Sequence, residues 1–227
     1  MSRTRVRNAF AGATASLLLF FSPSTANAQT VVYSTFGPGG SYAGWDQPVG
    51  NGLANPFGAF WSQAAGFVYA GATVLRLSGV SFPVRYQDVG PREFDASFWQ
   101  GSSMNGAVLL ESWSGVTGPD GLFVLPSQNA PLLLPGTMYW LSLSGSLNYW
   151  AWYTNDQGLT SDNSPMASSF QGAPWVTTDF IHAPAFEVTG TDVVPEPSTI
   201  ALLATGLAGL AAKRRARRQG KRLPRRC

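Results

Sequence analysis

The sequence predicts an all-β protein, a single jelly-roll-like β-sandwich flanked by an N-terminal signal peptide and a C-terminal transmembrane helix. Three observations support the β class. Short segments in the middle of the chain alternate apolar with polar or small residues, and clusters of Gly, Pro, Asn or Asp separate them. No stretch before Pro195 sustains a helical period of 3.6 residues. A series of short strands joined by turns favours a sandwich in which sequence neighbours pair.

The predicted strands follow one another along the middle of the chain. Residues 29–36 form the first, which ends at the glycine-rich turn 37–40, and residues 73–82 and 93–99 show the clearest alternation. Residues 57–70 are ambiguous between helix and strand. The remaining predicted strands are shorter and comprise residues 107–113, 122–125, 137–143, 147–153 and 185–188.

The predicted domain, residues 29–192, has a charge that differs from that of the whole chain. It contains three arginines, eleven acidic residues and no lysine, a net charge of −8, whereas the whole chain has a formal charge of +3. Nucleic-acid binding is therefore disfavoured, because phosphates require a basic surface. The one cysteine is Cys227, so the domain has no disulfide, no thiolate metal ligand and no thiol nucleophile.

Residues 1–28 have the three-part order of a secretory signal peptide. An arginine-rich segment precedes an apolar run over 9–21, and Ala26 and Ala28 form a small-x-small cleavage site. We expect signal peptidase to cut before Gln29 and the domain to be exported. A buried N-terminal helix is the alternative.

The C-terminal segment, residues 193–227, contains three blocks in sequence. Pro195, Glu196 and Pro197 hold the backbone extended, because proline fixes φ and lacks an N–H. The uncharged run that follows predicts a transmembrane helix over 198–212, which is short against a hydrocarbon core of about 30 Å. The basic tail predicts a cytoplasmic end and a domain outside the inner membrane. The basic stop comprises Lys213, Arg214, Arg215, Arg217 and Arg218.

This ending resembles the PEP-CTERM sorting signal of exported proteins in Gram-negative bacteria. The resemblance covers residues 193–218 and depends on the Pro-Glu-Pro element, the apolar run and the basic stop, although the tail continues to Cys227. It implies exosortase, a membrane cysteine peptidase, as the partner that recognises Pro-Glu-Pro. It also implies transient residence in the inner membrane with the domain periplasmic, followed by transfer to the cell surface or the extracellular space. An ordinary single-pass anchor is the alternative.

The domain also resembles the β-rich choice-of-anchor domains of exported bacterial proteins. The resemblance is carried by VYSTFGPGGSY at 32–42, LPGTMYWLSL at 134–143 and the pair Trp150 and Trp152. It implies a β fold and an exported surface role. No catalytic residue is established in that family, so the resemblance implies none here.

Aromatic residues suggest a ligand surface on one predicted strand. The cluster Tyr149, Trp150, Trp152 and Tyr153 could stack on sugar rings, with the two tryptophans on one strand face and the two tyrosines on the other. The alternative is that these large side chains fill the core of a domain that has no disulfide.

A calcium site is the one cofactor that the sequence suggests. Asp156, Asp162 and Asn163, with Gly158 between them, could supply oxygen ligands to Ca²⁺. Their spacing fits no defined calcium motif, and Asx-Gly clusters usually form turns. We otherwise expect no cofactor and no metal.

Catalytic residues are not predicted. Glu93 and Asp95 share a strand face, which suggests the acid pair of a glycosidase, but carboxylates placed in this way are usually solvated. His182 is the one histidine, and no Gly-x-Ser-x-Gly elbow accompanies it. The sequence therefore favours a non-enzymatic envelope or matrix protein associated with extracellular polysaccharide or biofilm. A carbohydrate-active enzyme or a dedicated sugar-binding module is the alternative.

Overall fold

The computed structural model describes residues 28–50, 61–87, 92–145, 149–179, 182–193, 204–211 and 213–214. Contacts divide the chain into two compact units. The larger is Asn27–Val193, and the smaller combines Met1–Ala26 with Val194–Cys227. The described part of the larger unit consists of strands and a short 3₁₀ turn, η1, at Pro38–Gly40.

The strands confirm the β class. Each of the eight segments predicted as strands overlaps an observed strand, and the ambiguous segment 57–70 contains β3. The strands are β1 (Gln29–Ser34), β2 (Ala43–Gly50), β3 (Trp61–Val68), β4 (Leu75–Tyr86), β5 (Glu93–Gln100), β6 (Val108–Thr117), β7 (Gly121–Pro126), β8 (Leu132–Leu133), β9 (Met138–Ser144), β10 (Tyr149–Thr154), β11 (Met166–Phe170), β12 (Val176–Thr177) and β13 (Glu187–Asp192).

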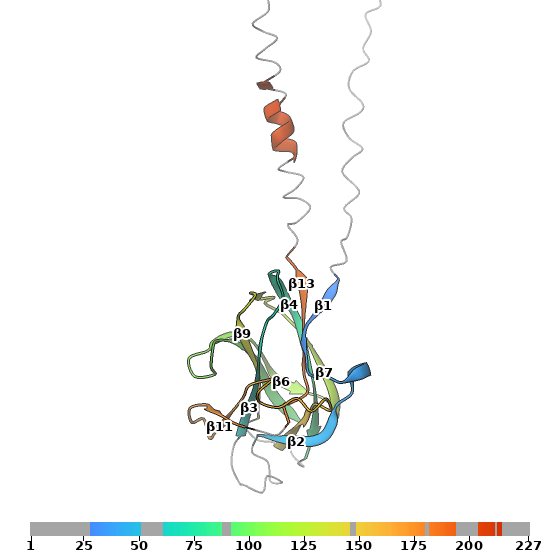
Figure 1. The fold of residues 1–227 in the computed structure, drawn as a ribbon, viewed down its shortest axis with the longest axis vertical. Coiled ribbons are helices and arrows are strands. Elements are labelled where there is room, and N and C mark those ends of the chain that lie inside the picture. Colours follow the sequence, from blue (N-terminus) through green and yellow to red (C-terminus); the bar gives the residue numbers. More distant parts are fainter. Residues whose placement is uncertain are drawn as a thin grey trace, which may run out of the picture. The chain divides into compact units, whose positions relative to one another are not determined.

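The strands form one curled antiparallel sheet, in which β1, β13 and β4 lie side by side (Figure 1). Its hydrogen-bonded order is β1-β13-β4-β10-β2-β3-β9-β5-β6, with β7 and β8 on β4 and β11 on β3. Most pairs join strands far apart in the chain, so the expectation that sequence neighbours pair is wrong for most of the sheet. A jelly-roll sandwich has two packed sheets, whereas the described strands are linked into a single sheet. The jelly-roll sandwich is therefore not confirmed and stays a prediction.

Aromatic side chains fill the concave side of the curl. Trp150, Trp152, Phe67 and Phe82 are among its largest fully buried side chains. Phe67 stacks on Tyr33 with ring centroids 4.7 Å apart. A buried side chain of this size stabilises the fold by roughly 1.5–3 kcal/mol relative to exposure, which helps a domain without a disulfide.

The features predicted at the C-terminus lie largely outside the described residues. Residues 204–211 and 213–214 are helical and exposed, including Lys213 and Arg214 of the basic stop. In the described ranges, no helix is both long enough and apolar enough to cross a membrane. The other predicted features at the chain ends lie outside the described residues, namely Pro195, Glu196, Pro197, Arg215, Arg217, Arg218, the first part of the predicted helix 198–212, and the signal peptide up to Asn27.

Candidate functional site

The tryptophans of the predicted sugar-stacking strand are part of the core. Trp150 and Trp152 are 1% and 0% exposed. Their indole N–H groups donate to backbone carbonyls, Trp150 to Glu93 at 3.1 Å and Trp152 to Ala185 at 2.9 Å. The strand β10 lies between β2 and β4, so both of its edges are paired. The prediction of a stacking surface on these two rings is therefore corrected, because neither ring has a face in contact with solvent.

The tyrosines of the same strand differ from each other. Tyr149 is buried, whereas Tyr153 is half-buried. The Tyr153 ring packs against Tyr42 with centroids 5.1 Å apart, and the Arg85 guanidinium carbon lies 6.0 Å from its centroid. Tyr153 is thus the one member of the predicted cluster that reaches the surface, and it is already in contact with two side chains.

The predicted calcium ligands lie in loops whose shape is held by hydrogen bonds within the chain. Buried Asn155 donates to the carbonyls of Leu159 and Ala183 and accepts from the Leu159 N–H. Asn163 Oδ1 accepts from the Thr160 N–H at 3.4 Å. Within the part of the chain that the structure describes, no three His, Cys, Asp or Glu side chains gather as a metal site would require. The hydrogen bonds of Asn155 and Asn163 are those of turn residues, as the turn interpretation expects.

The carboxylate pair and the histidine also have structural contacts. Asp95 Oδ1 accepts a hydrogen bond from the Gly115 N–H at 2.9 Å, which joins β5 to β6. Glu93 is exposed at the start of β5. The backbone carbonyl of His182 accepts from Gln47 Nε2 at 3.5 Å. This arrangement gives Asp95 a role in strand pairing.

A second aromatic cluster lies on the outer face of the sheet, where the sequence did not place one. Trp99 on β5 is the register partner of Trp140 on β9. Trp140 packs with Met104, and the half-buried Trp175 packs against this group. The Trp140 indole donates to the Gly101 carbonyl at 2.9 Å and the Trp99 indole to Ser142 Oγ at 2.8 Å. Strand alternation could have revealed it, because Trp140 lies between two core residues and must face the other way.

A cavity of about 250 Å³, here called the outer pocket, opens beside this cluster. Loop residues supply one wall, and β9, β11 and β12 supply the other. Its lining comprises Ser102, Ser103, Met104, Asn105, Met138, Trp140, Pro165, Ala167, Trp175 and Thr177. Aromatic and thioether groups meet hydroxyl and amide groups there, a mixture typical of small-ligand sites.

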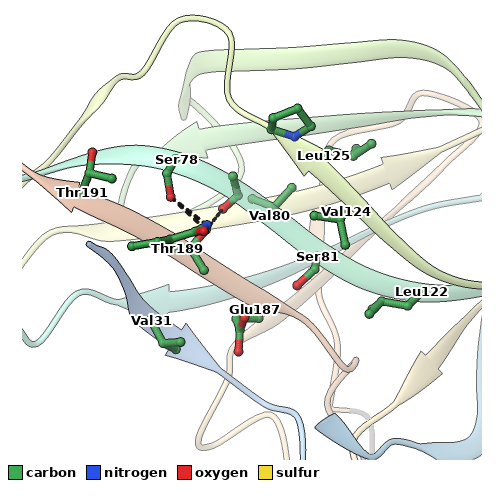
Figure 2. Close-up of a pocket in the computed structure, with 13 residues that line it drawn as sticks. Val31, Ser78, Val80, Ser81, Leu122, Val124, Leu125, Glu187, Thr189 and Thr191 are labelled. Atoms are coloured by element: carbon green, nitrogen blue, oxygen red, sulfur yellow. Dashed lines mark hydrogen bonds between the residues drawn. The ribbon is translucent and has the colours of Figure 1, made fainter. Parts of the chain in front are cut away.

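A shallower groove of about 650 Å³ runs over β1, β13, β4 and β7. Its floor has small side chains, including Ser78, Ser81 and Thr189, and Leu122 and Val124 of β7 stand beside it (Figure 2). The Ser78 hydroxyl donates to Thr189 Oγ1 at 3.0 Å, and Thr189 donates to the Gly79 carbonyl at 3.1 Å. The hydroxyls of Ser78 and Thr189 thus bond to each other and to the backbone, so these two groups direct no particular ligand chemistry.

Comparison with known proteins assigns the C-terminal end. Residues 193–216 match the family model described as the PEP-CTERM protein-sorting motif. This motif indicates an exported protein that transits the membrane and is sorted by exosortase to the cell surface. The matched range includes Pro195, Glu196 and Pro197. No curated protein matches the chain. The choice-of-anchor resemblance of the domain stays a prediction, since the matched motif lies outside it.

Proposed function

We propose that the chain is a non-catalytic protein of the cell envelope or extracellular matrix, which associates with extracellular polysaccharide after exosortase has removed its C-terminal signal. The observation that carries this proposal is the sorting motif at residues 193–216. The exported part is then the acidic β domain alone.

The distribution of charge along the chain supports a step in which the domain is released from the membrane. The basic tail after residue 212 is attracted to the anionic inner leaflet, by about 1 kcal/mol for each basic residue near the surface. The domain has a net charge of −8 and no lysine, so it has no comparable attraction to anionic headgroups. Removal of the tail therefore removes the principal electrostatic attachment to the membrane.

The absence of catalysis is part of the proposal. It is supported by the positions and contacts of the two candidate catalytic acids, Glu93 and Asp95. The Asp95 carboxylate accepts a hydrogen bond from the Gly115 N–H, and Glu93 precedes Asp95 on the same strand. A glycosidase instead needs two carboxylates on opposite sides of a bound sugar, roughly 5–10 Å apart. Carboxylates of one strand face point to the same side of the sheet, so they do not stand on opposite sides of a bound sugar.

Mass spectrometry of the mature C-terminus tests the sorting step in a host that contains exosortase. We expect the wild-type protein to end before the apolar run, and the variant Glu196→Ala to keep its tail and stay in the inner membrane. Thr199→Ala, outside the Pro-Glu-Pro element, is the matched control and should be processed normally. A wild-type protein that still ends at Cys227 would contradict the proposal.

Matrix fractionation tests the association separately. The processed protein should be recovered with extracellular polysaccharide and should be released into the soluble fraction when the polysaccharide is digested or its synthesis is deleted. Recovery that does not change with the polysaccharide would contradict the association but leave the sorting step intact.

A further inference from the structure

The outer pocket has a base that is built from buried side chains and a rim of half-buried and exposed ones. Trp140 and Ala167 are each 3% exposed and Met104 is 5% exposed, so the base of the cavity is part of a packed cluster. Trp175 is half-buried beside them and lines the cavity. Exposed side chains of Ser102, Ser103 and Thr177 line the cavity as well.

Asn105 fixes Trp175 at this cavity. Its side-chain nitrogen donates to the Trp175 carbonyl at 2.6 Å, and its side-chain oxygen accepts from the Trp175 N–H at 2.9 Å. The two residues are 70 positions apart in the chain. This two-point contact holds the backbone of Trp175 against the turn after β5, and so places its large aromatic side chain beside the cavity.

The chemistry of the cavity selects a neutral ligand. Among the described residues that line it, none has an ionisable side chain. The surrounding domain has a net charge of −8, which repels anionic polymers. The hydroxyls of Ser102 and Thr177 can exchange hydrogen bonds with neutral hydroxyl-bearing ligands, and Ser103, whose hydroxyl donates to the Asn105 carbonyl at 3.0 Å, can still accept one.

The size and the aromatic wall restrict the ligand further. A volume of about 250 Å³ lies below the roughly 300–1,000 Å³ of sites for drug-sized ligands, so a single ring fits and a longer ligand must continue outside. Aromatic faces carry a negative quadrupole that attracts the weakly positive C–H groups of a sugar ring. Polar groups beside the aromatic wall can meet the equatorial hydroxyls of that ring.

We propose that the outer pocket binds one neutral sugar ring of a polysaccharide, with the ring against Trp175 and its hydroxyls hydrogen-bonded to Ser102, Ser103 and Thr177. This site rests on the polysaccharide association proposed above and gives it a location and a ligand class. It replaces the β10 tryptophans as the sugar contact.

Isothermal titration calorimetry on the full chain in mild detergent tests the site. The probes are neutral hexasaccharides of β-1,4-glucan, α-1,4-glucan, β-1,4-mannan and β-1,4-galactan, with hexagalacturonate as the anionic comparison. We expect one or more neutral probes to bind, and Trp175→Ala to weaken that binding by about tenfold or more. Ser102→Arg, at an exposed loop position, should weaken it similarly by obstructing the cavity without unfolding the domain. Phe170→Ala removes an exposed aromatic that does not line the cavity and should leave the affinity within about twofold.

Three results would overturn the site. They are no binding of any neutral probe, binding of hexagalacturonate alone, and neutral binding that both Trp175→Ala and Ser102→Arg leave unchanged. The second result would reject only the neutral ligand class, and the third would reject only this location. Both are compatible with an association of the protein with polysaccharide. Failure of the association itself is seen independently, in the matrix fractionation.

Discussion

The carboxylate of Glu111 on β6 accepts a hydrogen bond from the hydroxyl of Ser127, sixteen positions further along the chain. The same carboxylate accepts the backbone N–H of Gln128 and, at 3.2 Å, that of Asn129. Trp113, two residues along β6, donates its indole N–H to the Pro126 carbonyl at 2.9 Å. In the described sheet, β6 pairs with β5 and β7 pairs with β4. These side-chain contacts therefore connect β6 to the turn after β7, where the backbone ladder does not.

Replacing this carboxylate should destabilise the domain. Glu111 is 2% exposed, and Glu111→Gln weakens three hydrogen bonds to a buried acceptor. We expect the free energy of unfolding to fall by about 1–3 kcal/mol, measured by urea denaturation. The matched control Asp162→Asn changes an exposed carboxylate and should stay within about 0.5 kcal/mol of wild type. Equal stability of Glu111→Gln and the control would show that the contact contributes nothing.

Truncation of the β10 tryptophans should affect folding before it affects binding. Trp152→Ala empties a fully buried site and leaves the Ala185 carbonyl without its indole donor. The expected loss is about 3–5 kcal/mol, measured by denaturant unfolding. A Trp152→Ala protein that is as stable as wild type yet no longer retained on polysaccharide would restore the sugar contact to β10.

Alkaline pH should destabilise the fold through two tyrosines. Burial raises the pKa of Tyr33 and the pKa of Tyr139 above their ordinary value of 10.0. The folded state therefore favours the protonated phenols, and this contribution is fully present below about pH 10 and is lost as pH rises through the folded-state pKa values. We expect the free energy of unfolding to fall above about pH 10, and to fall less steeply in the double variant Tyr33→Phe, Tyr139→Phe. Identical slopes for the two proteins would refute this assignment.

An apolar replacement of Gln63 should stabilise the domain. The residue is 1% exposed, and neither polar atom of its side chain has a hydrogen-bond partner among the residues that the structure describes. Gln63→Met keeps a similar volume and removes two buried polar groups, so we expect a gain of about 1 kcal/mol in thermal or urea unfolding. Gln47→Met is the contrasting variant, because Gln47 donates to the His182 carbonyl and its loss should bring no gain. A loss of stability in Gln63→Met would count against this account.

Alternation and turn residues predicted most of the strands but not all of them. The strand β2 contains Gly44, Asp46 and Pro48, which disfavour strands locally, yet it pairs in register with β10 over most of its length. Tertiary pairing decides such a segment, because β propensity depends on the neighbours that a strand meets. The strand β11 is rich in serine and was missed for the same reason, since its partner β3 is distant in the chain.

The location of the aromatic surface could not be predicted because it depends on what covers each face of the sheet. Alternation correctly separates Trp150 and Trp152 from their neighbours, but β10 is buried on both faces, including Ala151 at 0% exposure. The outer cluster depends on Asn105 contacting Trp175 across 70 positions, and no local pattern reports such a contact. The sorting motif, by contrast, is a continuous stretch of sequence, so its three blocks could be identified from the sequence alone.

The pairing of the first and last strands has a mechanical consequence. Gln29 on β1 lies opposite Thr191 on β13, and β13 is hydrogen-bonded along its other edge to β4. A pull on the C-terminal end of β13 runs along the strand, whereas antiparallel hydrogen bonds lie across it. Such a pull shears both ladders together instead of opening their bonds one at a time. A domain tethered through this end would resist drag with a strand that is hydrogen-bonded along both edges, so that β1 and β4 share the load.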